Sequence, residues 1–407
     1  GRYKDMDVIT LTDMRELIGK TQKGELSEDE LLEIEKVALP TYGTCAMLGT
    51  ANSMSCLAEI LGLSLPHCGT APAVSSEKRR IARNSGKRIV QMIQEGLTAR
   101  KILTRDALLN GIAATMAMGA STNTVLHLMS IANEAGVHLE LNDFDRISRE
   151  VPYICNLKPS GKYPIVALHE IGGLPAVLKA IEGKLKDGHL TVTGKTLKEN
   201  LKNQELVEND IIYPLSAPKN PEGGIAILYG TLAPDGAVVK KSGVKPCMYQ
   251  FEGRARVFHS MEDASYAVSN DLIQEGDVIV IRYEGPKGGP GMREMHMTTS
   301  LLVGRGMDES CALVTDGRFS GSTRGPCIGH ISPEAAEGGP IAAVEEGDRI
   351  RIDIPNRRLD LLVPQEVIEE RLKHVVPVYK ERTPSLAKYA SLVTSADKGA
   401  ILRIEKK

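Results

Sequence analysis

Residues 315–326, TDGRFSGSTRGP, combine the residue types that hold and act on small anions. Three glycines in this stretch allow the backbone to curl so that several N–H groups converge on one anion. Arg318 adds positive charge, and Ser320 or Ser322 offers a hydroxyl, which acts as a base once a metal or N–H groups stabilise its alkoxide. A polar surface turn is the alternative, and spacing alone does not choose between the two serines.

A carboxylate on a stiffened loop forms a second candidate site. Residues 283–295, YEGPKGGPGMREM, follow the strand pattern GDVIVIR and place Glu294 among glycines and prolines. A hard cation such as Mg²⁺ takes carboxylate oxygens in such a setting. The alternative is a solvated hairpin tip.

A cysteine beside a glycine-containing turn forms the third candidate site. The apolar spacing after PTYGTC predicts a helix over about 46–62, which places Cys45 at its start. Backbone N–H groups and the helix dipole favour a thiolate there, as a ligand or a nucleophile. A buried apolar cysteine is the alternative for Cys45, and it is the preferred interpretation for Cys56 and Cys68.

The elements that must position these residues change in type along the chain. Up to about residue 212, spacings of three and four predict helices, including two buried helices that part near GAST at 119–122. From about residue 213, short apolar runs between Gly, Pro and Asp turns predict strands, a hairpin near 349–363 and a helical tail. We therefore predict a mixed α/β protein whose second part, 213–407, is a β-barrel.

Composition excludes several classes of protein. Fifty basic against 52 acidic residues give a net charge of −2, and Trp is absent, so nucleic acid is not an expected partner. Apolar runs are too short for a bilayer span, and the first residues show no signal peptide. Seven scattered cysteines without CxxC exclude a disulfide framework and a zinc ribbon, and they indicate a reducing compartment.

The order of several longer motifs is specific. GTCAMLGTANSM, KPSGKY, HEIGGLPAV, FEGRARVF, KGGPGMREM, TDGRFSGSTRG and GHISPEAAEGGPIA follow one another along essentially the whole chain. In this order they resemble the family of dihydroxy-acid and sugar-acid iron–sulfur dehydratases. TDGRFSG and HISPEAAEGGPIA are similar to the dihydroxy-acid branch, because the sugar-acid branches tend to carry Met where Phe319 stands.

The resemblance implies a role for each candidate residue. Cys45 matches a ligand of an iron–sulfur cluster, of 2Fe–2S or 4Fe–4S type, and Glu294 matches a Mg²⁺-binding glutamate. Ser320 matches the serine proposed as the base. Arg318 and the backbone around Gly321 and Ser322 would then bind the substrate carboxylate. The implied fold is an N-terminal α/β domain, of which residues 1–212 are the remainder, followed by a C-terminal β-barrel, in a homodimer.

The implied reaction is the dehydration of 2,3-dihydroxy-3-methylbutanoate, and of its 3-methylpentanoate homologue, to 2-oxo acids of valine and isoleucine biosynthesis. An aldonic-acid dehydratase is the alternative within the family, and a non-catalytic remnant of the fold is the alternative outside it. In the family two more cluster cysteines, further Mg²⁺-binding acids and a lysine precede the position of GRYK. Either a preceding segment supplies them here, or the protein is a truncated product, and in the second case we expect the 407 residues alone to be inactive. The expected compartment is the cytoplasm, or a mitochondrion or plastid in a eukaryote.

Overall fold

The computed structural model describes residues 2–7, 10–39, 41–186, 188–376, 378, 380 and 382–403. The chain divides into two compact units, of which the first comprises Gly1–Leu11 and Glu33–Ile225 and the second Thr12–Leu32 and Ala226–Lys407. The domain boundary that the sequence predicts between residues 212 and 213 is not tested by this division and stays a prediction. Within the described ranges no helix has the length and apolarity needed to cross a membrane.

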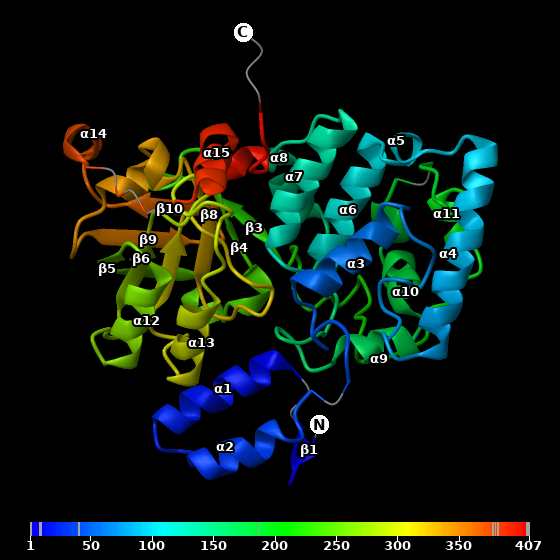
Figure 1. Cartoon of the computed structure of the whole chain (residues 1–407), viewed down its shortest axis with the longest axis horizontal. Helices are drawn as coiled ribbons and strands as arrows, with labels where there is room; N and C mark the ends of the chain where they lie inside the picture. The colour runs from blue at the N-terminus through cyan, green and yellow to red at the C-terminus, as the bar shows by residue number, and fades with distance from the viewer. Residues whose placement is uncertain are drawn as a thin grey trace. The chain divides into compact units, whose positions relative to one another are not determined.

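The first unit is built mainly from helices. Its short strands β1 (Arg2–Tyr3) and β2 (Met6–Asp7) form a small antiparallel pair. The helices are α3 (Thr50–Ile60), α4 (Ser76–Glu95), α5 (Ala99–Ile102), α6 (Arg105–Met118), α7 (Asn123–Ala135), α8 (Leu141–Glu150), α9 (Ile165–Glu170), α10 (Gly173–Ala180) and α11 (Leu197–Leu201) (Figure 1).

Helix α6 forms the centre of the first unit. Thr104 caps its first turn by accepting a hydrogen bond from the Ala107 N–H at 3.2 Å, and Gly119 ends it in the left-handed conformation. A Cβ added to Gly111 would lie 3.0 Å from a methyl carbon of Leu57, so the glycine allows α3 to pack closely on α6. The predicted division into two buried helices near 119–122 is confirmed.

An eight-stranded sheet in the order β10-β9-β5-β6-β7-β8-β4-β3 forms the core of the second unit. Strands β5 to β8 run parallel to one another, and the outer strands join them antiparallel. The bounds are β3 (Ala226–Leu228), β4 (Gly236–Val239), β5 (Gln250–Phe258), β6 (Asp277–Ile281), β7 (Ala312–Thr315), β8 (Cys327–Ser332), β9 (Arg349–Asp353) and β10 (Arg358–Leu361).

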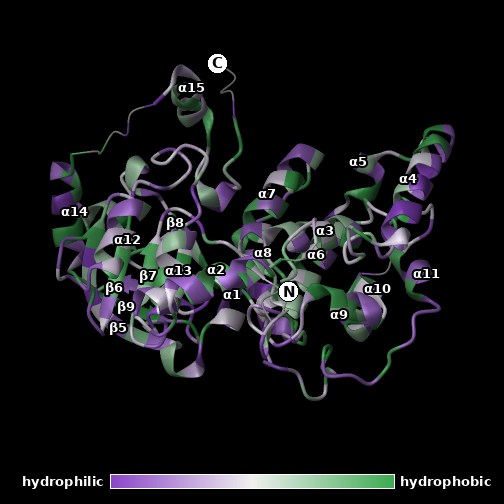
Figure 2. Ribbon diagram, turned by 60° about the horizontal axis from the view of Figure 1, so that its bottom comes forward, coloured by the Kyte–Doolittle hydropathy of each residue, from purple (hydrophilic) through white to green (hydrophobic). Residues whose placement is uncertain are grey.

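The sheet is nearly closed and barrel-like. Tyr229, just after edge strand β3, pairs with Arg358 of the other edge strand β10, and the Tyr229 N–H donates to the Arg357 carbonyl at 2.9 Å. Every residue of the parallel strands β6 and β7 is buried, as expected where both faces of a sheet are covered, and much of this region is hydrophobic (Figure 2). The predicted β9–β10 hairpin is confirmed, and so is a β-rich second half.

Helices accompany this sheet in the second unit (Figure 1). They are α12 (Met261–Ser269), α13 (His296–Gly304), α14 (Gln365–His374) and α15 (Pro384–Leu392), together with α1 (Leu11–Gln22) and part of α2 (Glu28–Glu35). Ser27 caps the first turn of α2, since its hydroxyl accepts from the Glu30 N–H at 3.1 Å. Helices α1 and α13 cross closely, because a Cβ on Gly19 would lie 2.5 Å from the Gly304 Cα.

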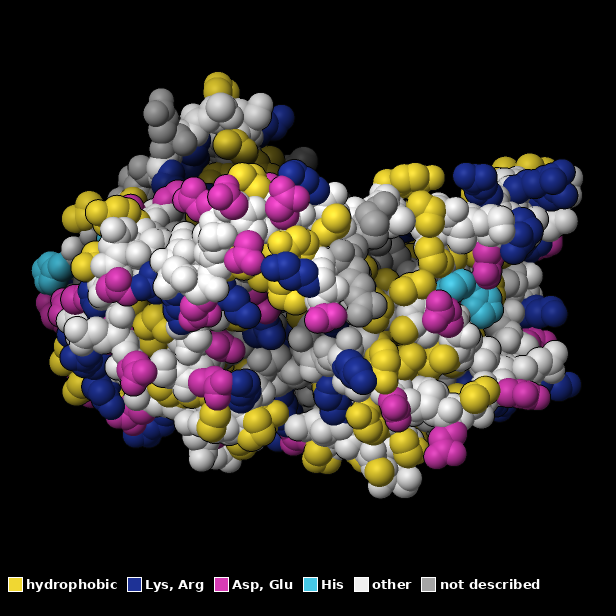
Figure 3. Space-filling model, turned by 90° about the horizontal axis from the view of Figure 1, so that it is seen from below, with side chains coloured by type: hydrophobic (Ala, Val, Ile, Leu, Met, Phe, Trp, Pro, Cys, Tyr) yellow, Lys and Arg dark blue, Asp and Glu magenta, His cyan; other side chains and the backbone are white. Residues whose placement is uncertain are grey.

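Basic and acidic side chains are mixed over most of the face that Figure 3 shows. This distribution agrees with the balanced composition of 50 basic and 52 acidic residues. The 3-10 helices are Glu182–Lys184, Lys241–Gly243, Pro246–Met248, Ala335–Glu337, Pro340–Ala343 and Ala396–Lys398.

Candidate active site

Three loops of the second unit begin where parallel strands end. Residues 282–295 follow β6, residues 316–326 follow β7, and residues 333–339 follow β8. Because the three strands are parallel, their carboxyl ends meet at one edge of the sheet, which is where open α/β sheets bind ligands. Residues 316–326 are also the crossover connection that two successive parallel strands require.

Asp316 ties the three loops together. Its buried carboxylate accepts hydrogen bonds from the N–H groups of Tyr283 at 3.0 Å, Glu284 at 2.9 Å and Ala335 at 3.0 Å. Burial raises the pKa of this carboxyl, while the three N–H groups favour its charged form. Asp316 therefore fixes the starts of all three loops relative to one another.

Glu334 holds the glycine-rich part of the first loop. Its two carboxylate oxygens accept from the Lys287 and Gly288 N–H groups, each at 2.8 Å. Burial, and then the nearby Asp316 carboxylate, raise the pKa of Glu334 to about 7. A Cβ at position 288 would lie 2.9 Å from the Tyr283 Cα, so only glycine allows this close approach.

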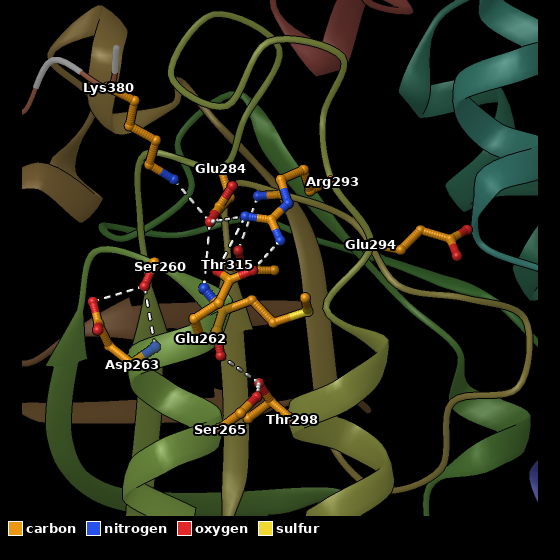
Figure 4. A network of polar contacts seen from close by, with 12 residues as sticks. Ser260, Glu262, Asp263, Ser265, Glu284, Arg293, Glu294, Thr298, Thr315 and Lys380 are labelled. Atoms are coloured by element: carbon orange, nitrogen blue, oxygen red, sulfur yellow. Dashed lines mark hydrogen bonds and ion pairs between the residues drawn. The ribbon is translucent and has the colours of Figure 1, made fainter. Parts of the chain in front are cut away.

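Glu284 anchors the end of the same loop. Its buried Oε1 lies 2.8 Å from the Lys380 amine, 3.5 Å from the Arg293 guanidinium and 3.3 Å from the Met261 N–H (Figure 4). Arg293 also pairs with Glu262 of α12. The residue that precedes Glu294 is therefore bound to two carboxylates, which restricts where Glu294 can lie.

The structure brings Glu294 next to the serine-bearing loop. Its backbone pairs with that of Arg318, since the Met295 N–H donates to the Arg318 carbonyl at 2.7 Å and the Arg318 N–H donates to the Arg293 carbonyl at 3.1 Å. Glu294 is half-buried, and its side chain points away from the Glu284 network (Figure 4). The guanidinium of Arg318 donates to the Met292 carbonyl at 2.6 Å, which joins the two loops a second time.

Within the loop, donors converge on Ser320. The Ser322 hydroxyl lies 3.1 Å from the Ser320 Oγ and donates to it, and the Ser322 N–H donates to the same atom at 3.4 Å. The Thr323 N–H donates to the Ser320 carbonyl at 3.1 Å. Arg324 forms an ion pair with Glu16 of α1. Of the backbone N–H groups predicted to bind a substrate carboxylate, that of Ser322 is thus directed at the Ser320 Oγ.

The expectation that a helix begins at Cys45 is wrong. Helix α3 begins at Thr50, with Gly49 as its N-cap, so Cys45 lies five residues before the helix and not in its first turn. The buried Asn52 amide donates to the carbonyls of Cys45 at 2.5 Å and Met47 at 2.7 Å and holds this stretch in a turn. The half-buried Cys45 stays a predicted ligand on the strength of the resemblance alone.

The first unit brings the Cys45 segment together with a second motif. The Leu48 N–H donates to the Lys158 carbonyl of KPSGKY at 2.8 Å, and the Ile165 N–H donates to the Ala46 carbonyl at 2.8 Å. Cys56 is fully buried in α3, and burial raises the pKa of its thiol. Cys68 is half-buried, 3.7 Å from the Lys78 amine.

The described residues alone do not fit an iron–sulfur cluster. Among them, no group of three or more His, Cys, Asp or Glu side chains is placed to hold a metal ion, whereas a cluster is held by several thiolates. Mg²⁺ makes a smaller demand, because it commonly takes one or two carboxylates and completes its shell with water and substrate oxygens. The half-buried Glu294 fits one such ligand.

Comparisons with known proteins identify the family of this chain. The model of the dihydroxy-acid/6-phosphogluconate dehydratase N-terminal region matches residues 1–200, and that of the C-terminal region matches residues 210–400. The chain is 54% identical over 396 residues to a dihydroxy-acid dehydratase of Geobacter metallireducens, which covers 97% of this chain and 71% of that protein. It is 51% identical over 405 residues to a dihydroxy-acid dehydratase of Pyrococcus furiosus, covering 99% and 73%. The chain therefore belongs to the dihydroxy-acid/6-phosphogluconate dehydratase family.

Proposed function

We propose that the protein is a hydro-lyase that dehydrates 2,3-dihydroxy-3-methylbutanoate and its 3-methylpentanoate homologue to the 2-oxo acids of branched-chain amino-acid biosynthesis. The names of the similar proteins support this reaction. The observation that carries it is local: two donors converge on the Ser320 Oγ, in a loop that pairs with the backbone of Glu294.

The reaction removes the C2 proton and the C3 hydroxyl of the substrate. The Ser320 alkoxide takes the C2 proton, the C–H electron pair forms the C2–C3 double bond, and the C3–O bond breaks with its electron pair on oxygen. The departing hydroxide takes up the proton that Ser320 removed, so that one water is released and the alkoxide is restored. The enol that remains becomes the 2-oxo acid by moving a proton from its oxygen to C3. Since a serine hydroxyl is a weak base, the Ser322 N–H and hydroxyl act by stabilising the Ser320 alkoxide. The direction of these bonds supports Ser320 over Ser322 as the base.

Other residues of the chain hold the substrate. The N–H of Gly321 and the charge of Arg318 are the candidate partners of its carboxylate. Glu294 would contribute one oxygen to Mg²⁺, which as a Lewis acid acidifies the C2–H of a bound 2-hydroxy acid. Cys45 alone does not account for a cluster, so no step of this mechanism is assigned to one.

The finer predictions of architecture belong to the same proposal. We infer that residues 1–212 are part of an α/β domain, that the nearly closed sheet is a β-barrel domain, and that the protein acts as a homodimer in the cytoplasm. The barrel-like pairing of Tyr229 with Arg358 supports the second of these inferences.

The experiment compares Ser320→Ala with Ser322→Ala in the protein carrying its iron–sulfur cluster. Ser320→Ala should lower kcat by about 10²–10⁴, the range for loss of a general base, with the visible cluster absorbance unchanged. Ser322→Ala should lower kcat by a smaller factor. Turnover of 2,3-dihydroxy-3-methylbutanoate is measured beside gluconate. Faster turnover of gluconate would favour the sugar-acid alternative, and no turnover of either acid by the cluster-loaded parent would refute the proposed activity.

A further inference from the structure

A buried lysine touches the loop that carries Ser320. Lys240 follows β4 directly, and only 3% of its surface is exposed. Its amine donates a hydrogen bond to the Gly321 carbonyl at 2.7 Å. Lysine is almost never fully buried unless its amine has a partner, and here that partner is a single backbone carbonyl of the candidate catalytic loop.

One peptide group connects Lys240 to Ser320. The carbonyl of Gly321 and the N–H of Ser322 belong to the same planar, trans peptide, so they point in opposite directions. Lys240 binds the carbonyl on one side, and the N–H on the other side donates to the Ser320 Oγ at 3.4 Å. Rotation of this peptide would break both contacts together.

We propose that Lys240 is a positioning residue for Ser320, acting through the Gly321–Ser322 peptide. The proposal rests on the proposed function, since it assumes that the Ser320 Oγ takes the substrate proton. Holding the carbonyl aims the Ser322 N–H at the developing alkoxide before the reaction begins. Hydrogen bonding at the carbonyl also polarises the peptide and makes its N–H a stronger donor.

The surroundings of Lys240 suit this role. Burial lowers the pKa of its amine to about 7, and both the neutral and the charged amine carry N–H donors. The segment after it is joined to the same loop, because the Gly325 N–H donates to the Gly243 carbonyl at 2.9 Å. Charged groups at this end of the loop include Arg324, which pairs with Glu16, and Asp308, which lies against Gly325.

The test compares Lys240→Met with Lys241→Met in the cluster-loaded protein. Methionine is about as long as lysine and suits a buried site, but it has no donor for the Gly321 carbonyl. Lys241 is a matched control because it is the next residue, is also buried, and places its amine over the Tyr249 ring, 5.7 Å from the centroid. Iron content and thermal unfolding are recorded for each variant.

Lys240→Met should lower kcat by about 10- to 100-fold. Removing a donor that contacts an oxyanion directly lowers kcat by about 10²–10³, and Lys240 acts only through a peptide group. KM should change by less than about threefold. With substrate deuterated at C2, the primary isotope effect on kcat should increase, because proton removal becomes slower relative to the other steps. Lys241→Met should leave the isotope effect at the parent value. Lys240→Arg keeps an N–H donor and should retain more activity than Lys240→Met. If Lys240→Met does not fold, Lys240→Arg takes its place in the comparison with Lys241→Met.

An unchanged kcat and isotope effect in Lys240→Met, when Ser320→Ala is inactive, would overturn the proposal. If Ser320→Ala instead keeps its turnover, the choice of Ser320 as the base is refuted, and the role of Lys240 needs a separate measurement. In that case a crystal structure of Lys240→Met decides: a rotated Gly321–Ser322 peptide supports positioning by Lys240, and an unmoved peptide contradicts it.

Discussion

Replacing Asp316 by Asn tests whether this carboxylate holds the site loops together. One of its oxygens, Oδ2, accepts from Tyr283 and Ala335, and the other, Oδ1, accepts from Glu284. In Asp316→Asn the single amide oxygen can replace only one of these two carboxylate oxygens. The NH₂ group takes the place of the other oxygen and faces a backbone N–H that then has no acceptor. An unpaired buried donor costs about 1–3 kcal/mol, and each remaining bond loses about 1 kcal/mol when its acceptor is no longer charged.

Part of this loss is offset, because burial already disfavours the charge of Asp316. The net expectation is a decrease of about 2–4 kcal/mol in the free energy of unfolding. Urea unfolding followed by circular dichroism at pH 7 measures it. Asp271→Asn is the control, since its side chain is 81% exposed and a surface change should stay within about 0.5 kcal/mol. If Asp316→Asn also changes the free energy of unfolding by no more than about 0.5 kcal/mol, the reasoning is refuted.

Two further predictions concern other carboxylates. Glu294→Gln should weaken Mg²⁺ binding to the cluster-loaded protein at least tenfold in a Mg²⁺ titration of activity. Glu366→Gln, at an exposed position in the first turn of α14, should leave the Mg²⁺ requirement unchanged. Burial raises the pKa of Glu59 to about 7, above its unfolded value, so the stability it contributes is present below about pH 4.5 and is lost as the pH rises through 7. The urea midpoint should therefore fall between pH 5 and 7.5, and Glu59→Gln should remove the share of Glu59, equivalent to roughly 2–4 kcal/mol. The share of Glu334, whose pKa burial also raises to about 7, should remain.

Much of the fold could be predicted because local patterns and the final structure agree. The division near Gly119 and the β9–β10 hairpin both follow from spacing and turn residues. Helices α12 and α13 were not predicted, because their spacing is weak beside the strands around them. The start of α3 was placed too early because apolar spacing does not register the side-chain contacts of Asn52, which hold residues 45–47 in a turn.

The candidate site could be predicted only in part. Glycines, hydroxyls and a carboxylate drew attention to Ser320 and Glu294, but their proximity depends on the parallel order of β6, β7 and β8, which no local pattern contains. Asp316 and Glu284 each stand just after a buried strand, and that position was the available signal for them. Lys240 had no comparable signal, since its contact with Gly321 joins residues 81 apart in the sequence.

Burying the charge of the acids at these strand ends is unfavourable, and this helps to explain what they do there. Glu284, Asp316 and Glu334 each have at most 1% of their surface exposed, and removing a carboxylate from water is unfavourable unless donors replace the water. Most of those donors are backbone N–H groups of the site loops, such as those of Lys287 and Gly288. A hydrophobic residue would avoid burying a charge, but it would leave these N–H groups without an acceptor and could not orient them. The acids are therefore better explained by the positions they give to Glu294 and Ser320 than by any gain in the stability of the sheet.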